Sequence, residues 1–371
     1  MKKFLTIIAA LTIILSSSIS AANERLIEAT GNYIMDSRLD ETAASATARA
    51  REEAKRAAVE KAGVYLQSYS KMVDLELDTD EVQTVAARLL KIQEESSNVE
   101  VVENNLLKFT VTIKALVDDL SDADLKAIMQ DKQTLEELTR KNKELQEKYD
   151  ALNREMEKYR NDFDKATDAQ KADIKKGVAR NVERFSAVDE FAKGNDFSLR
   201  KDYGQALAAY DAAIKLDPQL AEAYNNRGII KYELGQFSSA IADYTTAIKL
   251  KANYFNALNN RGNAYTTLEQ YQSAERDLKA ALKLNDKSAA AHNNLGSVYY
   301  SVKNFDAAIK EFTRAIQLNP NFAEAFYNRA VTYYRQGNLI QSLTDMKKAR
   351  ELKSDDAEIK ALFEKISREA G

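Results

Sequence analysis

The chain has 371 residues, of which 30% are charged, and its formal net charge is only -3. This mildly acidic balance gives no reason to expect nucleic acid as a partner. Since there is no cysteine, disulfides, thiolate nucleophiles and cysteine-ligated metals are excluded. Two prolines and 11 glycines predict a mostly helical protein with few long loops.

Residues 1–22 have the pattern of a secretory signal peptide. Lys2 and Lys3 precede an apolar run at residues 4–15, and small residues follow as far as Ala22. The apolar run is shorter than the roughly 20 residues that span a bilayer, so cleavage is favoured over an uncleaved membrane anchor. We therefore expect an exported protein of the periplasm or cell envelope, or a secreted one.

Residues 23–119 predict a small α+β domain. A strand at residues 26–35 contains Gly31 and precedes an alanine-rich helix, about residues 41–69, which Asp40 or Thr42 could cap. Small residues at helical spacing in this helix imply close packing against a sheet. A second helix is expected at about 80–92, and two further strands at 99–103 and 106–115.

Several segments of this domain match a known pattern: residues 28–31, 42–50, 57–66 and 109–113. The domain resembles the small extracytoplasmic domain at the N-terminus of flagellar assembly protein T, which is also found in a related family of small outer-membrane lipoproteins. The resemblance covers about a quarter of the chain. It implies an assembly or scaffold module without catalysis.

Residues 120–186 predict a coiled coil and a linker helix. Apolar residues recur at heptad spacing between about 125 and 163, with Glu and Lys on the flanks. The alternative is one long helix that folds back on residues 172–185, but we favour pairing between chains. Asn142, polar within the seam, favours a parallel dimer, and the tyrosines leave a trimer open. The expected oligomer interface comprises Leu135, Leu138, Asn142, Leu145, Tyr149, Leu152 and Met156.

From Ala187 a unit of 34 residues recurs five times, over residues 187–356. Its eighth position is Gly or Ala, its twentieth Ala or Ser, and its twenty-seventh always Ala, as two closely packed antiparallel helices require. These units resemble tetratricopeptide repeats, which implies a right-handed helix-turn-helix superhelix. The usual leucine at position seven is replaced by Arg227, Arg261 and Arg329 and is retained only as Leu295. Residues 357–371 predict a capping helix.

The resemblance places positions 5, 6 and 12 of each unit on the inner, concave face of the superhelix. An asparagine amide both donates and accepts, so a ladder of asparagines could hold the backbone of an extended peptide. The alternative is that these asparagines only cap or brace the helix pair. The expected peptide-binding residues are Asn225, Asn259 and Asn293 at position 5, Asn226, Asn260, Asn294 and Asn328 at position 6, and Tyr232, Tyr300 and Tyr334 at position 12.

The residues needed for catalysis or cofactor binding are largely missing from the sequence. His292, the sole histidine, lies where an aromatic residue usually packs, so core packing is expected. No glycine-rich phosphate loop is present. We expect a non-enzymatic scaffold without cofactor or metal, which binds an extended protein segment and forms a homodimer or homotrimer. The alternative is a structural component of the cell envelope that self-associates, with the N-terminal domain as its main binding module.

Overall fold

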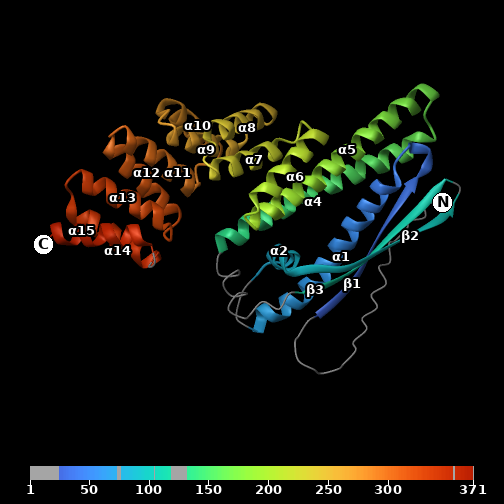
Figure 1. Cartoon of the computed structure of the whole chain (residues 1–371), viewed down its shortest axis with the longest axis horizontal. Helices are drawn as coiled ribbons and strands as arrows, with labels where there is room; N and C mark the ends of the chain where they lie inside the picture. The colour runs from blue at the N-terminus through green and yellow to red at the C-terminus, as the bar shows by residue number, and fades with distance from the viewer. Residues whose placement is uncertain (1–24, 73–76, 104, 118–131, 354–355, 371) are drawn as a thin grey trace. The chain divides into compact units, whose positions relative to one another are not determined.

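The computed structural model describes residues 25–72, 77–103, 105–117, 132–353 and 356–370 (Figure 1). The predicted leader and the first residues of the predicted coiled coil lie outside the described residues. The chain divides into two compact units, residues 1–147 and 148–371. No helix among the described residues is both long enough and apolar enough to cross a membrane.

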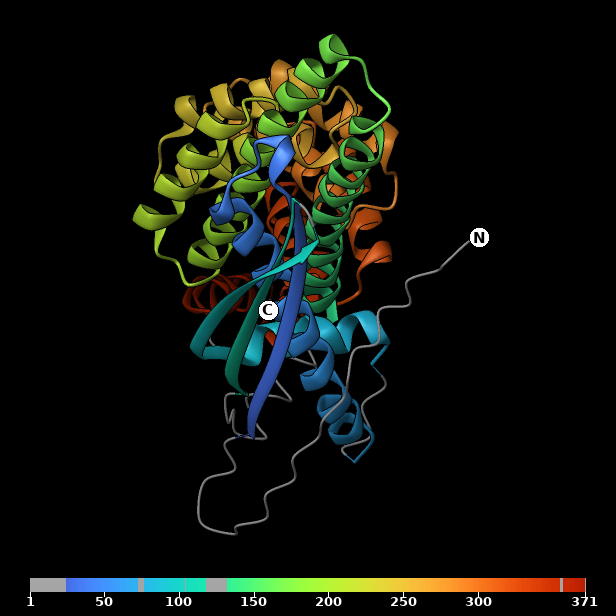
Figure 2. The ribbon, with the colours of Figure 1, turned by 90° about the vertical axis from the view of Figure 1, so that its right-hand side faces the viewer.

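The first unit contains an antiparallel sheet of three strands in the order β1-β3-β2 (Figure 2). Its elements follow the chain as β1 (Arg25–Asp36), a short 3-10 helix (Ser37–Leu39), α1 (Ala43–Met72), α2 (Thr79–Leu89), β2 (Leu90–Glu103) and β3 (Leu106–Val117). Thr42 caps α1, because its hydroxyl accepts the backbone N–H of Ser45 at 3.1 Å. Asp78 and Glu81 form a capping box at the start of α2.

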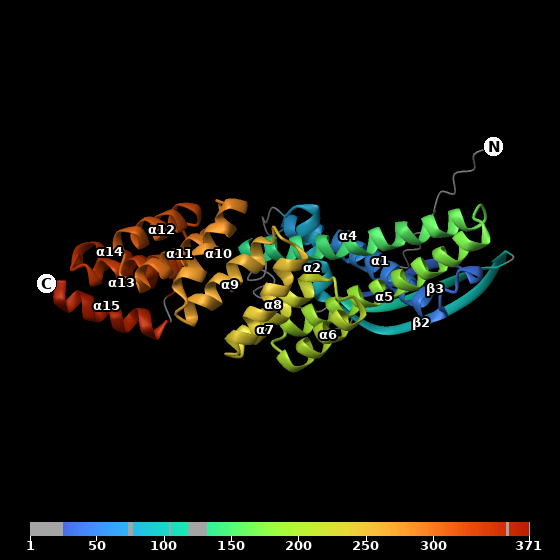
Figure 3. The same ribbon diagram turned by 90° about the horizontal axis from the view of Figure 1, so that it is seen from above.

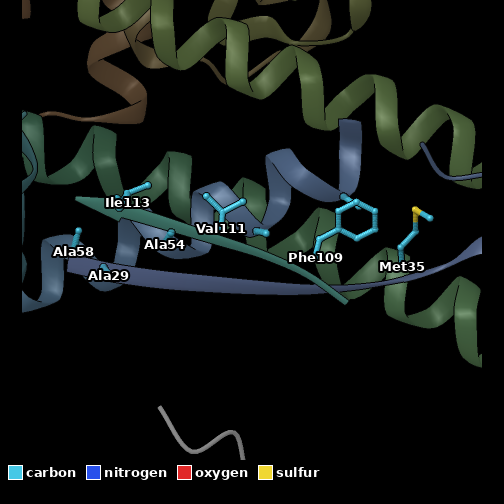
Figure 4. Packing of buried hydrophobic residues seen from close by; sticks show 9 residues of the cluster. Ala29, Met35, Ala54, Ala58, Phe109, Val111 and Ile113 are labelled. Atoms are coloured by element: carbon cyan, nitrogen blue, oxygen red, sulfur yellow. The ribbon is translucent and has the colours of Figure 1, made fainter. Parts of the chain in front are cut away.

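Helix α1 packs against the sheet through a stripe of alanines, as the small-residue spacing predicts. Ala46, Ala50, Ala54 and Ala58 are fully buried against residues of β1 and β3 such as Phe109, Val111 and Ile113 (Figure 4). Gly31 of β1 lies against the backbone of α1, and a Cβ added there would lie 2.1 Å from the carbonyl oxygen of Ala50. This contact explains the glycine inside the strand.

The predicted boundary between the second helix and the second strand is wrong. Helix α2 ends at Leu89 rather than near residue 92, and β2 begins at Leu90 rather than at Val99. The first half of β2 is rich in polar residues and exposed on both faces, so it lacks the alternation that identifies a half-buried strand.

Two long helices, α4 (Lys132–Phe163) and α5 (Asp168–Leu199), run antiparallel as a hairpin (Figures 1 and 3). Within the second unit, the rings of Tyr149 and Phe185 lie 5.1 Å apart. The amide of Asn181 donates to the carbonyl oxygen of Leu152 at 3.0 Å. The described chain therefore folds back on itself here, which is the alternative that the sequence left open.

The rest of the second unit is a regular array of antiparallel helix pairs (Figure 3). The second half of α5 and α6 (Tyr203–Leu216) form the first repeat. The later pairs are α7 (Ala221–Glu233) with α8 (Phe237–Leu250), α9 (Phe255–Thr267) with α10 (Tyr271–Leu284), α11 (Ala289–Ser301) with α12 (Phe305–Leu318), and α13 (Ala323–Arg335) with α14 (Leu339–Leu352). Helix α15 (Ala357–Ala370) follows, with Ile359 and Ile366 buried. The predicted fold class, mainly helical with a small α+β part and a superhelix of repeats, is confirmed.

The eighth and twenty-fourth positions pack together in every repeat. A Cβ added at Gly228 would lie 2.7 Å from the ring of Tyr244, and one at Gly296 would lie 2.6 Å from that of Phe312. In the fifth repeat Ala330 faces the flexible side chain of Met346 instead. A rigid aromatic ring thus requires glycine opposite it, while methionine leaves room for a methyl group.

Candidate peptide-binding face

The asparagines at position six form hydrogen bonds between successive repeats. The amide nitrogen of Asn260 donates to Oδ1 of Asn225 at 3.2 Å, and that of Asn294 donates to Oδ1 of Asn259 at 3.1 Å. The same bond recurs from Asn328 to Asn293 at 3.0 Å. Each bond joins position six of one repeat to position five of the preceding one, so these residues brace adjacent first helices.

The hydrogen bond between the first and second repeats differs because the first repeat has no asparagine at position five. Asn226 instead donates to Oδ1 of Asn195 at 2.9 Å, and the hydroxyl of Tyr210 donates to the same oxygen at 3.0 Å. Burial raises the pKa of Tyr210 to about 12. Asn225 completes the network by donating to Oδ1 of Asn226 at 3.0 Å.

The brace leaves part of each position-six amide available. An amide has two N–H donors and a carbonyl oxygen with two lone pairs, and the inter-repeat bond uses one donor. Asn260, Asn294 and Asn328 are only half-buried, and their carbonyl oxygens accept no hydrogen bond from residues 132–353 or 356–370. Bracing and peptide binding are therefore compatible at these positions.

The tyrosines at position twelve form a second ladder, toward position thirteen of the next first helix. The hydroxyl of Tyr232 lies 3.0 Å from Oγ1 of Thr267, and that of Tyr300 accepts from Nε of Arg335 at 3.3 Å. Tyr334 donates to Oε1 of Glu369 in α15 at 3.1 Å. All three tyrosines are half-buried, and α15 takes the place of a further first helix.

One end of the predicted inner face already carries a contact within the chain. Lys148 of α4 lies 3.3 Å from the carboxylate of Glu222 at position two of the second repeat, and Lys251 lies 3.5 Å from it. Burial raises the pKa of Glu222, but Lys148, a backbone hydrogen bond and Lys251 together outweigh this effect and hold the pKa below its usual value. Glu324, at the same position of the fifth repeat, remains exposed.

A network of arginines and aspartates was not predicted from the sequence. At position seven, Arg261 donates from Nε and Nη2 to both oxygens of Asp277, at 2.6 and 2.9 Å, and from Nη1 to Oγ1 of Thr245 in the preceding repeat. Arg329 makes the same bonds with Asp345 and Thr313, and Arg227 with Asp243 and Asp211. The constant spacing of 16 residues between arginine and aspartate was the available signal.

The fourth repeat lacks this network. Leu295 occupies position seven and is 3% exposed, packed with Leu278 and Val298. The sequence position of His292 predicted packing in the core, but its side chain is only half-buried. Its Nδ1 lies 2.6 Å from the carboxylate of Glu311, and its Nε2 lies 3.1 Å from the carbonyl oxygen of Asp286.

The residues expected at an oligomer interface lie in several environments. Tyr149, Leu152 and Met156 are buried and lie on the part of α4 that contacts α5 of the same chain. Leu135 belongs to the core of the first unit. Leu138 and Leu145 are half-buried, and Asn142 is exposed. The single chain thus already uses three of the seven positions in its hairpin, and the homodimer or homotrimer stays a prediction.

Comparison with known families identifies the repeats. Tetratricopeptide repeat models match residues 198–254 and 255–288, and a further TPR repeat model matches residues 297–337. These matches lie in the second unit, so the likeness of the first unit to the flagellar assembly protein T domain stays a prediction. A comparison with curated proteins finds no match.

Similar solved structures cover about half of the chain. YrrB, described as a TPR protein with an unusual peptide-binding site, is 26% identical, with a TM-score of 0.41 over 51% of this chain and 96% of its own. MamA is 25% identical, with a TM-score of 0.40 over 47% of this chain and 94% of its own. PilW, a type IV pilus biogenesis factor, is 22% identical, with a TM-score of 0.47 over 49% and 84%.

Proposed function

Since the second unit contains tetratricopeptide repeats, we propose that this protein is an exported, non-enzymatic scaffold whose repeats hold an extended segment of a partner protein. The observation that carries the proposal is the row of position-six asparagines, Asn260, Asn294 and Asn328. Each amide is fixed by one hydrogen bond and keeps an open carbonyl oxygen and a second N–H.

Fixed amides at a constant repeat spacing suit the backbone of an extended peptide. Because the inter-repeat bond orients each amide before binding, little side-chain entropy is lost when a peptide adds its own N–H and C=O groups. The tyrosines at position twelve add flat contact area at low entropic cost. The contact of Glu222 with Lys148 makes the third to fifth repeats the more accessible part of this face.

The test separates peptide binding by the position-six amides from their role in the hydrogen bonds between repeats. Asn260→Ala with Asn328→Ala removes two inter-repeat bonds and two half-exposed amides. Asn225→Ala with Asn293→Ala removes the acceptors of the same two bonds, but both of these side chains are buried. The probe is a phage-displayed library of random peptides of twelve residues, selected on the full chain.

Selected peptides should bind the Asn260→Ala/Asn328→Ala variant at least about tenfold more weakly. The Asn225→Ala/Asn293→Ala variant keeps these amides but no longer orients them, so its binding should weaken by only about threefold. Calorimetry measures both affinities, and circular dichroism confirms that each variant is folded. Equal losses in the two variants, or no enriched peptide, would sink the proposal.

Export and dimerisation are further parts of the proposal. The leader pattern of residues 1–22 supports export to the periplasm or cell envelope, and the N-terminal sequence of protein recovered from cell fractions would test it. Dimerisation through α4 could use Leu138, Asn142 and Leu145, whose side chains are not buried. A second candidate function, a self-associating component of the cell envelope, is favoured by the exposure of β2.

A further inference from the structure

Strand β2 is exposed along almost its whole length. Helix α1 covers β1 and β3, and every side chain from Lys91 to Glu103 is exposed. Four large apolar side chains lie on this strand: Ile92, Val99, Val101 (77% exposed) and Val102. A long edge strand with apolar side chains is a template for pairing with another strand.

The two outer strands of the sheet differ in whether their free backbone edge has hydrogen-bond partners. On the edge of β1, α1 supplies partners for the backbone: Glu53 accepts the N–H of Asn32 at 2.7 Å, and Lys61 donates to the carbonyl oxygen of Glu28 at 2.6 Å. From Ile92 to Glu103, the outer backbone edge of β2 has no hydrogen bond to any described residue. Among the described residues, the outer edge of β2 is therefore open to a further strand.

We propose that β2 pairs antiparallel with β2 of a second copy of this chain, about a two-fold axis at Ser97. The strand is self-complementary around that residue. The register with β3 places Ile92, Ser97 and Val101 on the face covered by α1, and Lys91 and Glu103 on the opposite face. The ladder with β3 skips one residue near each end, Gln93 between Ile92 and Glu94 and Val102 between Val101 and Glu103. The axis then pairs Ile92 with Val101 and Lys91 with Glu103.

The charges agree with this register. The one pair of like charges that this register brings together is Glu94 opposite Glu100. The ammonium nitrogen of Lys114 lies 2.7 Å from the carboxylate of Glu94 and offsets its charge. Glu95, opposite Val99, is held by Arg51. An axis at Val99 would leave Lys91 and Ile92 beyond the paired region, and an axis at Glu95 would place two glutamates face to face. An axis moved by one residue, to Ser96, would keep the same faces but pair Lys91 with Glu100 instead of Glu103, so the charge exchange between Lys91 and Glu103 tests the register.

The pairing gives the chain an isologous interface that is independent of the repeats. Two sheets of three strands become one continuous sheet, with backbone hydrogen bonds across the axis and apolar pairs at both ends. The interface does not depend on peptide binding by the repeats, so each can fail without the other. It is an alternative to pairing through α4 as the source of dimerisation, and the experiments distinguish the two.

The first experiment measures the mass of the full chain by sedimentation over a range of concentrations. Wild type should form a dimer, and Val101→Lys should raise the dissociation constant at least about tenfold, because it places a lysine opposite Ile92 of the partner. The matched control is Val64→Lys on α1, where the valine is also largely exposed at 68%, and it should dimerise as wild type does. Circular dichroism confirms that each variant is folded.

The second experiment tests the register. Lys91→Glu and Glu103→Lys should each weaken the dimer, and the two together should restore it, because the exchange recreates an opposite-charge pair. A wild-type chain that stays monomeric overturns the proposal. A dimer that survives Val101→Lys but is lost in Leu145→Asp overturns it too, and assigns association to α4.

Discussion

The first helix of the fourth repeat is held differently from those of the second, third and fifth repeats. In those three, a position-seven arginine binds an aspartate of its own repeat and an oxygen acceptor of the preceding one, supplied by Asp211, Thr245 and Thr313. In the fourth repeat, the corresponding residue of the preceding repeat is Lys279, which binds Glu275 at 2.6 Å. An arginine there would face a cation, and the position holds Leu295 instead.

The difference shows that a departure from the family pattern has to be interpreted across the repeat boundary. Each repeat contacts only its neighbours, so the identity of one residue constrains the residue that packs on it from the next unit. Arginine occurs where the preceding repeat offers an acceptor, and leucine where it offers a lysine. Substitutions that remove the arginine, or place one in the fourth repeat, test this relationship.

The largest effect is expected for Arg261→Leu. It leaves the carboxylate of Asp277 buried without its guanidinium partner and also removes the bond to Thr245. The free energy of unfolding should fall by about 3 kcal/mol, because the pair is mostly but not fully buried. Urea unfolding of the full chain, followed by circular dichroism, measures the loss.

Its control is Arg261→Leu combined with Asp277→Leu, which removes both charges and imitates the apolar contact of Leu295. This double variant should unfold within about 1 kcal/mol of wild type. If the single and double variants are equally unstable, lost packing rather than an uncompensated charge explains the effect.

A smaller effect is expected for Leu295→Arg, which transfers the arginine to the fourth repeat. The new guanidinium would meet Lys279, and Glu311 already binds His292. Unfolding free energy should fall by about 2 kcal/mol, and adding Lys279→Thr should recover about half of the loss. A single variant as stable as wild type would contradict the proposed relationship between the two positions.

The smallest effect is expected for His292→Phe. Position four carries Tyr224 in the second repeat and Phe326 in the fifth, so the ring itself fits. The loss of about 1 kcal/mol should come from Glu311, whose carboxylate then lacks its partner. Glu311→Leu added to His292→Phe should restore stability in the same urea measurement, and a persistent loss would assign the effect to the bond with Asp286.

The repeat fold could be predicted because its signals recur. Small residues at fixed positions repeat five times, and those at position eight are explained by one contact, such as Gly228 against Tyr244. The first half of strand β2 could not be located from its pattern, because Lys91, Gln93 and Glu94 lie on an exposed edge where no buried face imposes alternation. Heptad spacing in α4 predicted an apolar seam but could not say which helix covers it.

The candidate site was predicted in position but not in its contacts. Sequence spacing assigned Asn260 to position six, yet its bond to Asn225 crosses 35 residues and depends on how two repeats are offset. The salt bridge of Lys148 with Glu222 was not foreseeable, since it depends on the fold-back of α4. The arginine–aspartate pairs were accessible to sequence reasoning, because both partners belong to one repeat.

Helix α5 belongs to two structures at once. Its first half packs against α4, its second half is the first helix of the repeats, and its 32 residues run without a break. A continuous helix of that length is a rod of about 48 Å. Within the second unit, the hairpin is therefore joined rigidly to the repeats rather than by a flexible linker. A force applied to the tip of the hairpin would act on the first helix pair as a torque.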